Sequence, residues 1–187
     1  MNIDELIKAI EFSITDCENI IKNNPDAVLS EGDLEKHLSA CISRRIGYVA
    51  ENPNRDSYAV YTQISHYDNE TEDKDAEVDI LLMIPNKIER KIDIHKRFVY
   101  KSKDSVAIEL KYRHDDNAAC VTSVKGDIDK FSTYKSDSCY FVVALLDRND
   151  KTAEHEGAIM EYYNKKKGEM GRQYEDHFFC KVLIKEV

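Results

Sequence analysis

One acid and one amine stand two positions apart in an apolar part of the sequence. The segment 105–112 alternates as a strand does, so Glu109 and Lys111 share one face of it, opposite its large apolar side chains. Upstream, Asp79 interrupts another apolar run. Buried acids are costly unless they are paired or bound to a cation. These three side chains are therefore the first candidates for chemistry.

Asp79 and Glu109 would repel each other if their strands are neighbours, and a divalent cation with oxygen ligands relieves such repulsion. Mg²⁺, or Mn²⁺ in its place, is the natural candidate. Such an ion polarises a phosphoryl group and makes a bound water more acidic. A nearby lysine, here Lys111, orients that water or stabilises the charge that develops on the phosphate. The residue types match hydrolysis of a phosphodiester bond.

A third acid is expected from the helix that precedes these strands. Glu31 and Glu35 are four residues apart and so lie on one face of a helix predicted from Ser30 to about Gly47. We prefer Glu31 as a ligand of the metal or its water, because negative charge is favoured in the first helical turn, and we keep Glu35 as the alternative. Acids are common in first turns, so a structural role is an equal alternative for either residue.

Apolar periodicity predicts the elements that must position these residues. An N-terminal amphipathic helix and the helix at Ser30 come first, and Ser30-x-x-Asp33 resembles a capping box. Three β-rich segments fit a meander, and a strand, a helix and a further strand then imply a crossover. The predicted segments are helix 3–21, helix 30–47, strands 58–65, 77–84 and 105–112, helix 124–134, strand 139–146, helix 158–167 and strand 178–184.

An acid on a helix, an aspartate on a strand and Glu109-Leu-Lys111 on the next strand resemble the PD-(D/E)XK nuclease superfamily, which is restriction-endonuclease-like. The resemblance spans about residues 30–146. It implies an α/β fold with a core of helix, three-stranded antiparallel meander, helix and strand, here with an N-terminal helix and C-terminal additions. It also implies that Asp79 and Glu109 bind metal and that Lys111 is the catalytic lysine. The proline of the motif's name is absent before Asp79.

The E-x-K tripeptide has little force alone, because it occurs about once by chance in a charged chain of this size. Glu89-Arg-Lys91 also fits it, yet stands in a polar, basic stretch. Glu109-Leu-Lys111 gains weight from its apolar strand, the upstream acids and the helix and strand that follow. An ordinary solvated strand face is the alternative for this pair.

Basic residues near these motifs are candidates for contact with a nucleic-acid backbone. The segment 85–104 holds seven Lys or Arg against three acids. Substrate contact through Lys96 and Arg97 is one interpretation of it, and a solvated loop or helix is the other. Arg113 follows the motif strand, and Lys125 opens the next predicted helix, where it could face the scissile phosphate or simply be a surface lysine.

The bulk composition limits the function classes. A chain of 187 residues suits one domain, 1–187, with a core of its own. A net charge of −9 lacks the broad electrostatic attraction of unspecialised nucleic-acid binders. A nucleic acid must therefore meet a local basic patch, or be presented by a homodimer or a partner protein.

Other motifs are absent from the sequence. The five cysteines are odd in number and form no CxxC pair, which favours free thiols in a reducing cytoplasm. No apolar run approaches the roughly 20 residues of a membrane span, and the N-terminus carries acids where a signal peptide is basic. The six histidines form no HExxH, and no serine stands in a G-x-S-x-G elbow.

The sequence thus predicts a cytoplasmic, Mg²⁺- or Mn²⁺-dependent nuclease that acts on nucleic acid, with DNA as the expected substrate. Two alternatives stay open. One is a non-catalytic interaction module on the same fold, which the acidic net charge favours. The other is a catalytic subunit that is silent without a partner.

Overall fold

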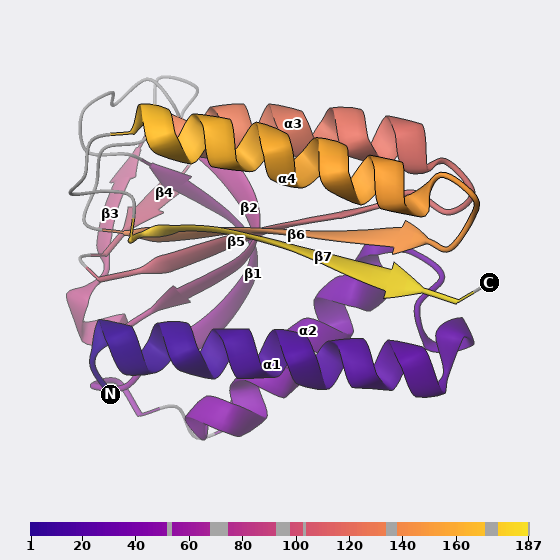
Figure 1. Cartoon of the computed structure of the whole chain (residues 1–187). Helices are drawn as coiled ribbons and strands as arrows, with labels where there is room; N and C mark the ends of the chain where they lie inside the picture. Colours follow the sequence, from indigo (N-terminus) through magenta and orange to yellow (C-terminus); the bar gives the residue numbers. More distant parts are fainter. Residues whose placement is uncertain are drawn as a thin grey trace.

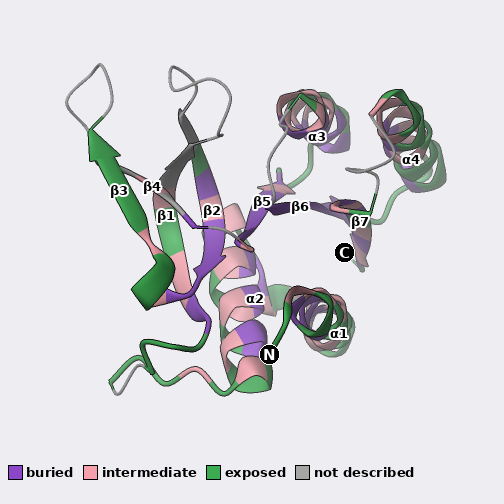
Figure 2. Ribbon diagram, turned by 90° about the vertical axis from the view of Figure 1, so that its left-hand side faces the viewer, coloured by how far each residue is buried: buried purple, intermediate pink, exposed green. Residues whose placement is uncertain are grey.

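The computed structural model describes residues 1–51, 54–67, 75–92, 98–102, 104–133, 138–170 and 176–186. A seven-stranded sheet runs through the molecule (Figure 1). Two α-helices, α1 and α2, cover one face of the sheet, and α3 and α4 cover the other (Figure 2). The predicted α/β class is confirmed.

The elements follow the predicted order, with two more strands inserted. In chain order they are α1 (Ile3–Asn23), the 3-10 helix η1 (Pro25–Ala27), α2 (Glu31–Ile46), β1 (Ala59–Tyr67), β2 (Asp75–Met83), the 3-10 helix η2 (Pro85–Lys87), β3 (Glu89–Ile92), β4 (Phe98–Lys101), β5 (Val106–Tyr112), α3 (Asn117–Ser132), β6 (Cys139–Asp147), α4 (Thr152–Glu169) and β7 (Phe178–Lys185).

The sheet is mixed, with the strand order β3-β4-β1-β2-β5-β6-β7. β2 pairs antiparallel with both β1 and β5, so the predicted three-stranded meander is present. β6 lies parallel to β5 after the α3 crossover, and β7 lies parallel to β6 after α4. The crossover inferred from the order strand, helix, strand is therefore confirmed.

The basic segment between β2 and β5 forms strands, which corrects the expectation of a loop or helix. β3 and β4 pair antiparallel as a hairpin, and β4 joins β1 at the pair His66–Tyr100. All four residues of β3 are exposed, so both faces of the strand are polar or solvated. Because neither face of β3 is buried, its sequence carries no alternation from which this strand could be recognised.

Two helices begin earlier than the periodicity predicts. α3 begins at Asn117 rather than 124, and the Asp116 carboxylate caps it by accepting the Ala119 amide at 3.0 Å. α4 begins at Thr152 rather than 158. The first turns of both helices have few large apolar residues, so periodicity detects only the later turns.

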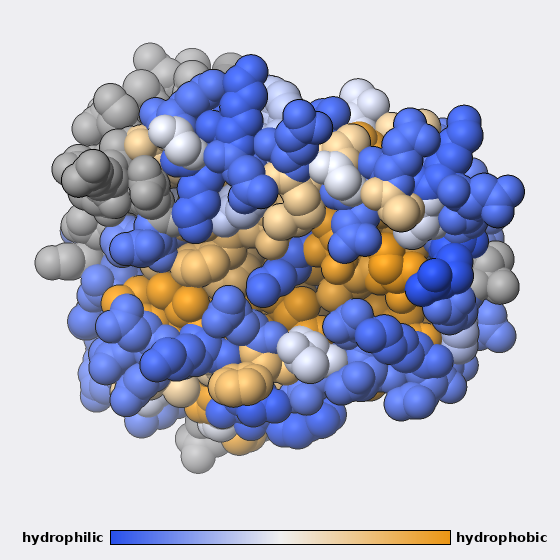
Figure 3. All heavy atoms as spheres, in the orientation of Figure 1, coloured by the Kyte–Doolittle hydropathy of each residue, from blue (hydrophilic) through white to orange (hydrophobic). Residues whose placement is uncertain are grey.

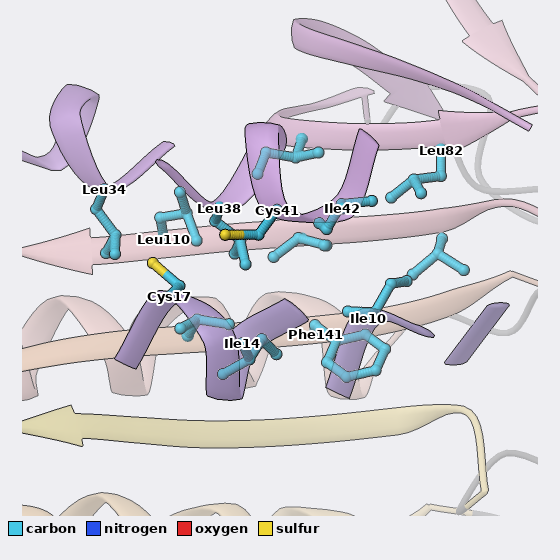
Figure 4. Packing of buried hydrophobic residues seen from close by; sticks show 14 of the residues in the cluster. Ile10, Ile14, Cys17, Leu34, Leu38, Cys41, Ile42, Leu82, Leu110 and Phe141 are labelled. Atoms are coloured by element: carbon cyan, nitrogen blue, oxygen red, sulfur yellow. The ribbon is translucent and has the colours of Figure 1, made fainter. Parts of the chain in front are cut away.

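Two apolar clusters fill the spaces on either side of the sheet. The cluster under α1 and α2 packs helix residues such as Ile14 and Leu38 against Leu110 and Phe141 of the sheet (Figure 4). The cluster under α3 and α4 includes Phe131. All nine residues of β6 are buried, as expected for a parallel strand covered on both faces.

β7 forms one edge of the sheet, and apolar residues are exposed beside it. Figure 3 shows apolar surface between α1 and α4. A hollow of about 470 Å³ lies between α1 and β7, lined in part by Phe12, Val182 and Leu183, and Phe12 is 59% exposed.

All five cysteines are buried and free. Across the described ranges, no helix has both the length and the apolar character that a membrane crossing requires.

Candidate active site

The candidate site lies where β2 and β5 separate. The ladder between the two strands runs over three pairs and ends at Ile80–Ile108, although β5 continues to Tyr112. In Figure 1, strands β1 and β2 turn away from the direction of β6 and β7. Alternate amides of β5 beyond Ile108 therefore lack the strand partner that they would have in a continuous ladder.

Two acids take the place of that missing partner. The Leu110 amide donates to Asp79 Oδ2 at 2.7 Å, and the Tyr112 amide donates to Glu31 Oε2 at 3.2 Å. Glu31 is in the first turn of α2, which Ser30 caps by accepting the Asp33 amide. Glu31, predicted from the helix, and Asp79, predicted from the strand, thus bind two amides that lie two residues apart along one edge of β5.

Glu109 and Lys111 project from the same strand toward α3. Lys111 Nζ lies 3.1 Å from Glu109 Oε1 and 3.8 Å from Glu31 Oε1. Both side chains are largely buried, with Glu109 10% and Lys111 17% exposed. The structure therefore brings Glu31, Asp79, Glu109 and Lys111 together around the end of the β2–β5 ladder.

α3 adds two charged side chains that the sequence analysis did not single out. Asp127 Oδ2 lies 3.6 Å from Lys111 Nζ. Lys130 Nζ lies 3.4 Å from Glu109 Oε2 and donates to the Glu77 carbonyl at 3.0 Å, which links α3 to both sides of the split. The spacing of the apolar residues in α3 could have predicted this placement. Asp127 and Lys130 flank the helix face that packs on the sheet.

Glu35 lies on the other side of the split. Gln63 Nε2 donates to Glu35 Oε2 at 2.6 Å and to Asp79 Oδ1 at 3.3 Å. Gln63 has a left-handed backbone with φ of 53°, which is strained for a residue with a Cβ. The two acids of α2 thus divide their contacts: Glu31 binds β5, and Glu35 binds Gln63 of β1, which in turn reaches Asp79 of β2.

Burial and neighbouring charges shift the ionisation of the central groups. Burial raises the pKa of Glu109, against the opposing charges of Lys130 and Lys111. Burial also raises the pKa of Asp127 to about 7, and the charge of Glu109 adds to that shift. Burial alone would lower the pKa of Lys111, but the surrounding carboxylates outweigh it and raise that pKa. These are the shifts expected of carboxyl and ammonium groups that are crowded together and partly removed from water.

The chemistry of these groups fits a divalent cation with oxygen ligands. Five carboxyl groups meet two ammonium groups in this region, namely Glu31, Glu35, Asp79, Glu109 and Asp127 with Lys111 and Lys130. Asp127 Oδ2 is buried with no hydrogen-bond partner within 3.5 Å, and its ion-pair partner Lys111 Nζ lies 3.6 Å away. Mg²⁺ and Mn²⁺ favour carboxylate oxygens, and their charge would offset the repulsion among these acids.

Comparison with known proteins assigns no family to this chain. No protein-family model matches it, and neither the curated proteins nor the solved structures contain a match. The functional interpretation therefore depends on the geometry of the site itself.

Two of the four predicted substrate contacts are among the described residues, and neither joins this cluster. Lys125 points to α4, with Nζ 5.3 Å from the centroid of the Tyr162 ring. It is about 200° around the helix from Asp127, at roughly 100° per residue, and so cannot face the same partners. Arg113 is exposed just beyond β5. Lys96 and Arg97 lie outside the described residues.

A second group of possible metal ligands lies at the ends of β5 and β6. His114, Asp115 and Asp147 offer ligand atoms that all lie within 4.8 Å of one another. Both oxygens of the buried Asp147 already accept protein hydrogen bonds, from the Tyr112 hydroxyl at 3.0 Å and from the Asp115 amide at 2.9 Å. These bonds give Asp147 a structural role in holding the turn after β5.

Proposed function

We propose that this protein is a divalent-metal-dependent nuclease of the PD-(D/E)XK type, which hydrolyses phosphodiester bonds in nucleic acid, with DNA as the expected substrate. One observation carries the proposal. At the end of the β2–β5 ladder, Asp79 binds the Leu110 amide and Glu31 binds the Tyr112 amide. On the same strand, Glu109 directly precedes Leu110, and Lys111 lies between Leu110 and Tyr112. Acids and an amine from two strands and a helix thus gather at the end of this ladder.

The order of the elements supports the same proposal. Helix α2, the antiparallel strands β1, β2 and β5, helix α3 and the parallel strand β6 follow the order that the resemblance implies. In this fold the hairpin of β3 and β4 and the additions α1, α4 and β7 leave the split between β2 and β5 intact. The acids therefore lie on the same elements as the resemblance implies.

Each of the four residues has a role in this proposal. Asp79 and Glu109 would hold the Mg²⁺ or Mn²⁺ ion, and Glu31 would bind the ion or a water beside it. The bound ion would act as a Lewis acid on the phosphoryl group and acidify a water. Lys111 orients the attacking water and offsets negative charge on the phosphate, and its neighbours Glu109 and Asp127 keep its ammonium in place.

A nuclease assay with matched variants tests this function. Purified protein is incubated with single- and double-stranded DNA and RNA in Mg²⁺ or Mn²⁺. We expect cleavage by the wild type and a loss of at least about 100-fold in Asp79→Asn and Glu109→Gln, because each removes a charged metal ligand. Asp129→Asn is the control, since that carboxylate binds Tyr162 and Lys166 on α4. Equal cleavage by wild type and Asp79→Asn would remove the assignment.

The acidic net charge of −9 favours a second candidate, a non-catalytic module that binds a partner protein. Calorimetric titration with Mn²⁺ separates the two. A nuclease site binds the ion and loses that binding in Glu109→Gln, whereas an interaction module has no such site. If Mn²⁺ binds but no nucleic acid is cleaved, the chain fits a catalytic subunit that requires a partner, and cleavage after addition of that partner is then the test.

A further inference from the structure

Lys130 has a place in the candidate site that neither the motif nor the proposed catalytic roles explain. Its ammonium contacts Glu109 Oε2 at 3.4 Å and the Glu77 carbonyl at 3.0 Å, so it reaches from α3 across the separated strands. Glu109 is thus held by two ammonium groups, by Lys111 on one oxygen and by Lys130 on the other. Both oxygens of a proposed metal ligand are already paired with cations.

The spacing of the acids is consistent with this arrangement. Among the described residues, one set of three His, Cys, Asp or Glu side chains has ligand atoms that all lie within 4.8 Å of one another. That set is His114, Asp115 and Asp147. Glu31, Asp79 and Glu109 therefore do not converge that closely, and the ammonium of Lys111 stands among Glu31, Glu109 and Asp127. Lysine nitrogens occupy space between the carboxylates.

We propose that Lys130 is a resident competitor of the divalent cation: it neutralises Glu109 in the metal-free protein and must release it when the ion binds. This inference rests on the proposed function, because it concerns the same metal site. Lys130 is 27% exposed and its ammonium ends a flexible chain, so release needs only a change of side-chain rotamers. The freed ammonium then lies beside the site, where it can contact a phosphate of the substrate.

Competition has a consequence that a merely structural lysine would not have. Removal of the competing charge should make the site bind the ion more tightly, whereas loss of a structural support should weaken binding or leave it unchanged. Partly exposed ion pairs contribute up to roughly 1 kcal/mol, so we expect the Kd of Mn²⁺ to fall about three- to fivefold in Lys130→Met and Lys130→Gln.

The experiment is a calorimetric titration of the full chain with MnCl₂ at fixed ionic strength, with thermal unfolding of each variant as the folding check. Lys125→Met is the matched control, because it removes the same charge from the same helix but its ammonium faces Tyr162. We expect tighter binding in both Lys130 variants, and a Kd within about twofold of wild type in Lys125→Met. Two different substitutions guard against one that fails to fold.

The outcomes separate the inference from the function on which it rests. If the wild type binds Mn²⁺ and Glu109→Gln abolishes binding, but the Lys130 variants bind equally or more weakly, the competition is refuted and the nuclease proposal stands. If tighter binding occurs equally in Lys125→Met, the effect is one of general charge and the competition is again refuted. If the wild type binds no Mn²⁺, both proposals fail.

Discussion

Asp127 carries a carboxyl group that the fold has largely removed from water. Its side chain is 13% exposed, and the partner of its buried Oδ2 is the Lys111 ammonium, 3.6 Å away. Burial raises its pKa from 3.8 to about 7 even though Lys111 is close by. The folded protein therefore binds this proton over a pH range in which the unfolded chain has already lost it.

The shift predicts a pH dependence of stability at this residue. The pKa of Asp127 is raised from 3.8 to about 7. The protonated side chain therefore contributes its full stabilisation of the folded state below about pH 4, and this stabilisation is lost as pH rises toward 7. Asp127→Asn has no ionisable group at this position and so does not lose this stability. The free energy of unfolding of the variant minus that of the wild type should therefore increase by on the order of 3 kcal/mol between pH 4 and pH 8. Urea unfolding at several pH values measures it.

Asp129 provides an internal control with the opposite sign. Hydrogen bonds from Lys166 and Tyr162 lower the pKa of Asp129, so its stabilising contribution is present above its ordinary pKa and is lost in acid. The free energy of unfolding of Asp129→Asn should therefore be lower than that of the wild type near pH 7. The two values should become similar in acid. A pH-independent difference between Asp127→Asn and wild type would contradict the assigned shift.

At the scale of elements, the start of α2 fixes the position of Glu31. Ser30 caps the helix by accepting the Asp33 amide and also donates to Asp33 Oδ2 at 2.9 Å. Glu31 is the first residue of the helix, directly after the cap. A change at Ser30 therefore affects both the helix and one acid of the site.

Ser30→Ala should lower the free energy of unfolding by about 1 kcal/mol, because an orphan amide at the helix start loses its acceptor. Ser39→Ala on the same helix is the control: its hydroxyl is buried without a hydrogen-bond partner, so its removal should cost nothing or stabilise slightly. Denaturant unfolding of both variants measures the difference. Equal destabilisation by the two substitutions would show that the cap is unimportant.

The same scale shows where sequence patterns predict elements well and where they do not. The cap at Ser30 and the strand around Glu109 were predicted, because each depends on residues close in the sequence. The hairpin of β3 and β4 was missed because its first strand is exposed throughout. A pattern based on burial cannot detect a strand that buries neither face.

At the scale of the whole molecule, buried Lys185 joins parts of the chain that are far apart in sequence. It is 3% exposed, and its ammonium donates to the Val28 carbonyl at 2.8 Å and to the Tyr112 hydroxyl at 2.9 Å. The Tyr112 hydroxyl in turn donates to Asp147. The last strand thus ties the segment before α2 to the end of β5, next to Glu31 and Lys111.

Lys185→Met should destabilise the protein by about 2–4 kcal/mol, because it leaves buried acceptors without their donor. The exposed Lys181 on the same strand is the control, and Lys181→Met should cost less than about 0.5 kcal/mol, since its contact with Glu11 is a surface ion pair. Thermal or urea unfolding of both variants gives the comparison. A loss below 1 kcal/mol in Lys185→Met would show that the tether is dispensable.

The sequence by itself determined which residues could do chemistry on a single element. Strand alternation places Glu109 and Lys111 on one face, and helical spacing places Glu31 and Glu35 one turn apart. These relations depend on backbone geometry alone, so they hold wherever the element lies in the fold.

Only the tertiary structure decided which of these residues meet and what surrounds them. The β2–β5 ladder ends at Ile80–Ile108, and that ending lets Asp79 and Glu31 bind the free amides of β5. The rotation of α3 about its axis turns Asp127 and Lys130 toward the site and Lys125 away from it. Side chains distant in sequence meet only after the elements pack, and packing depends on the whole core rather than on any local pattern.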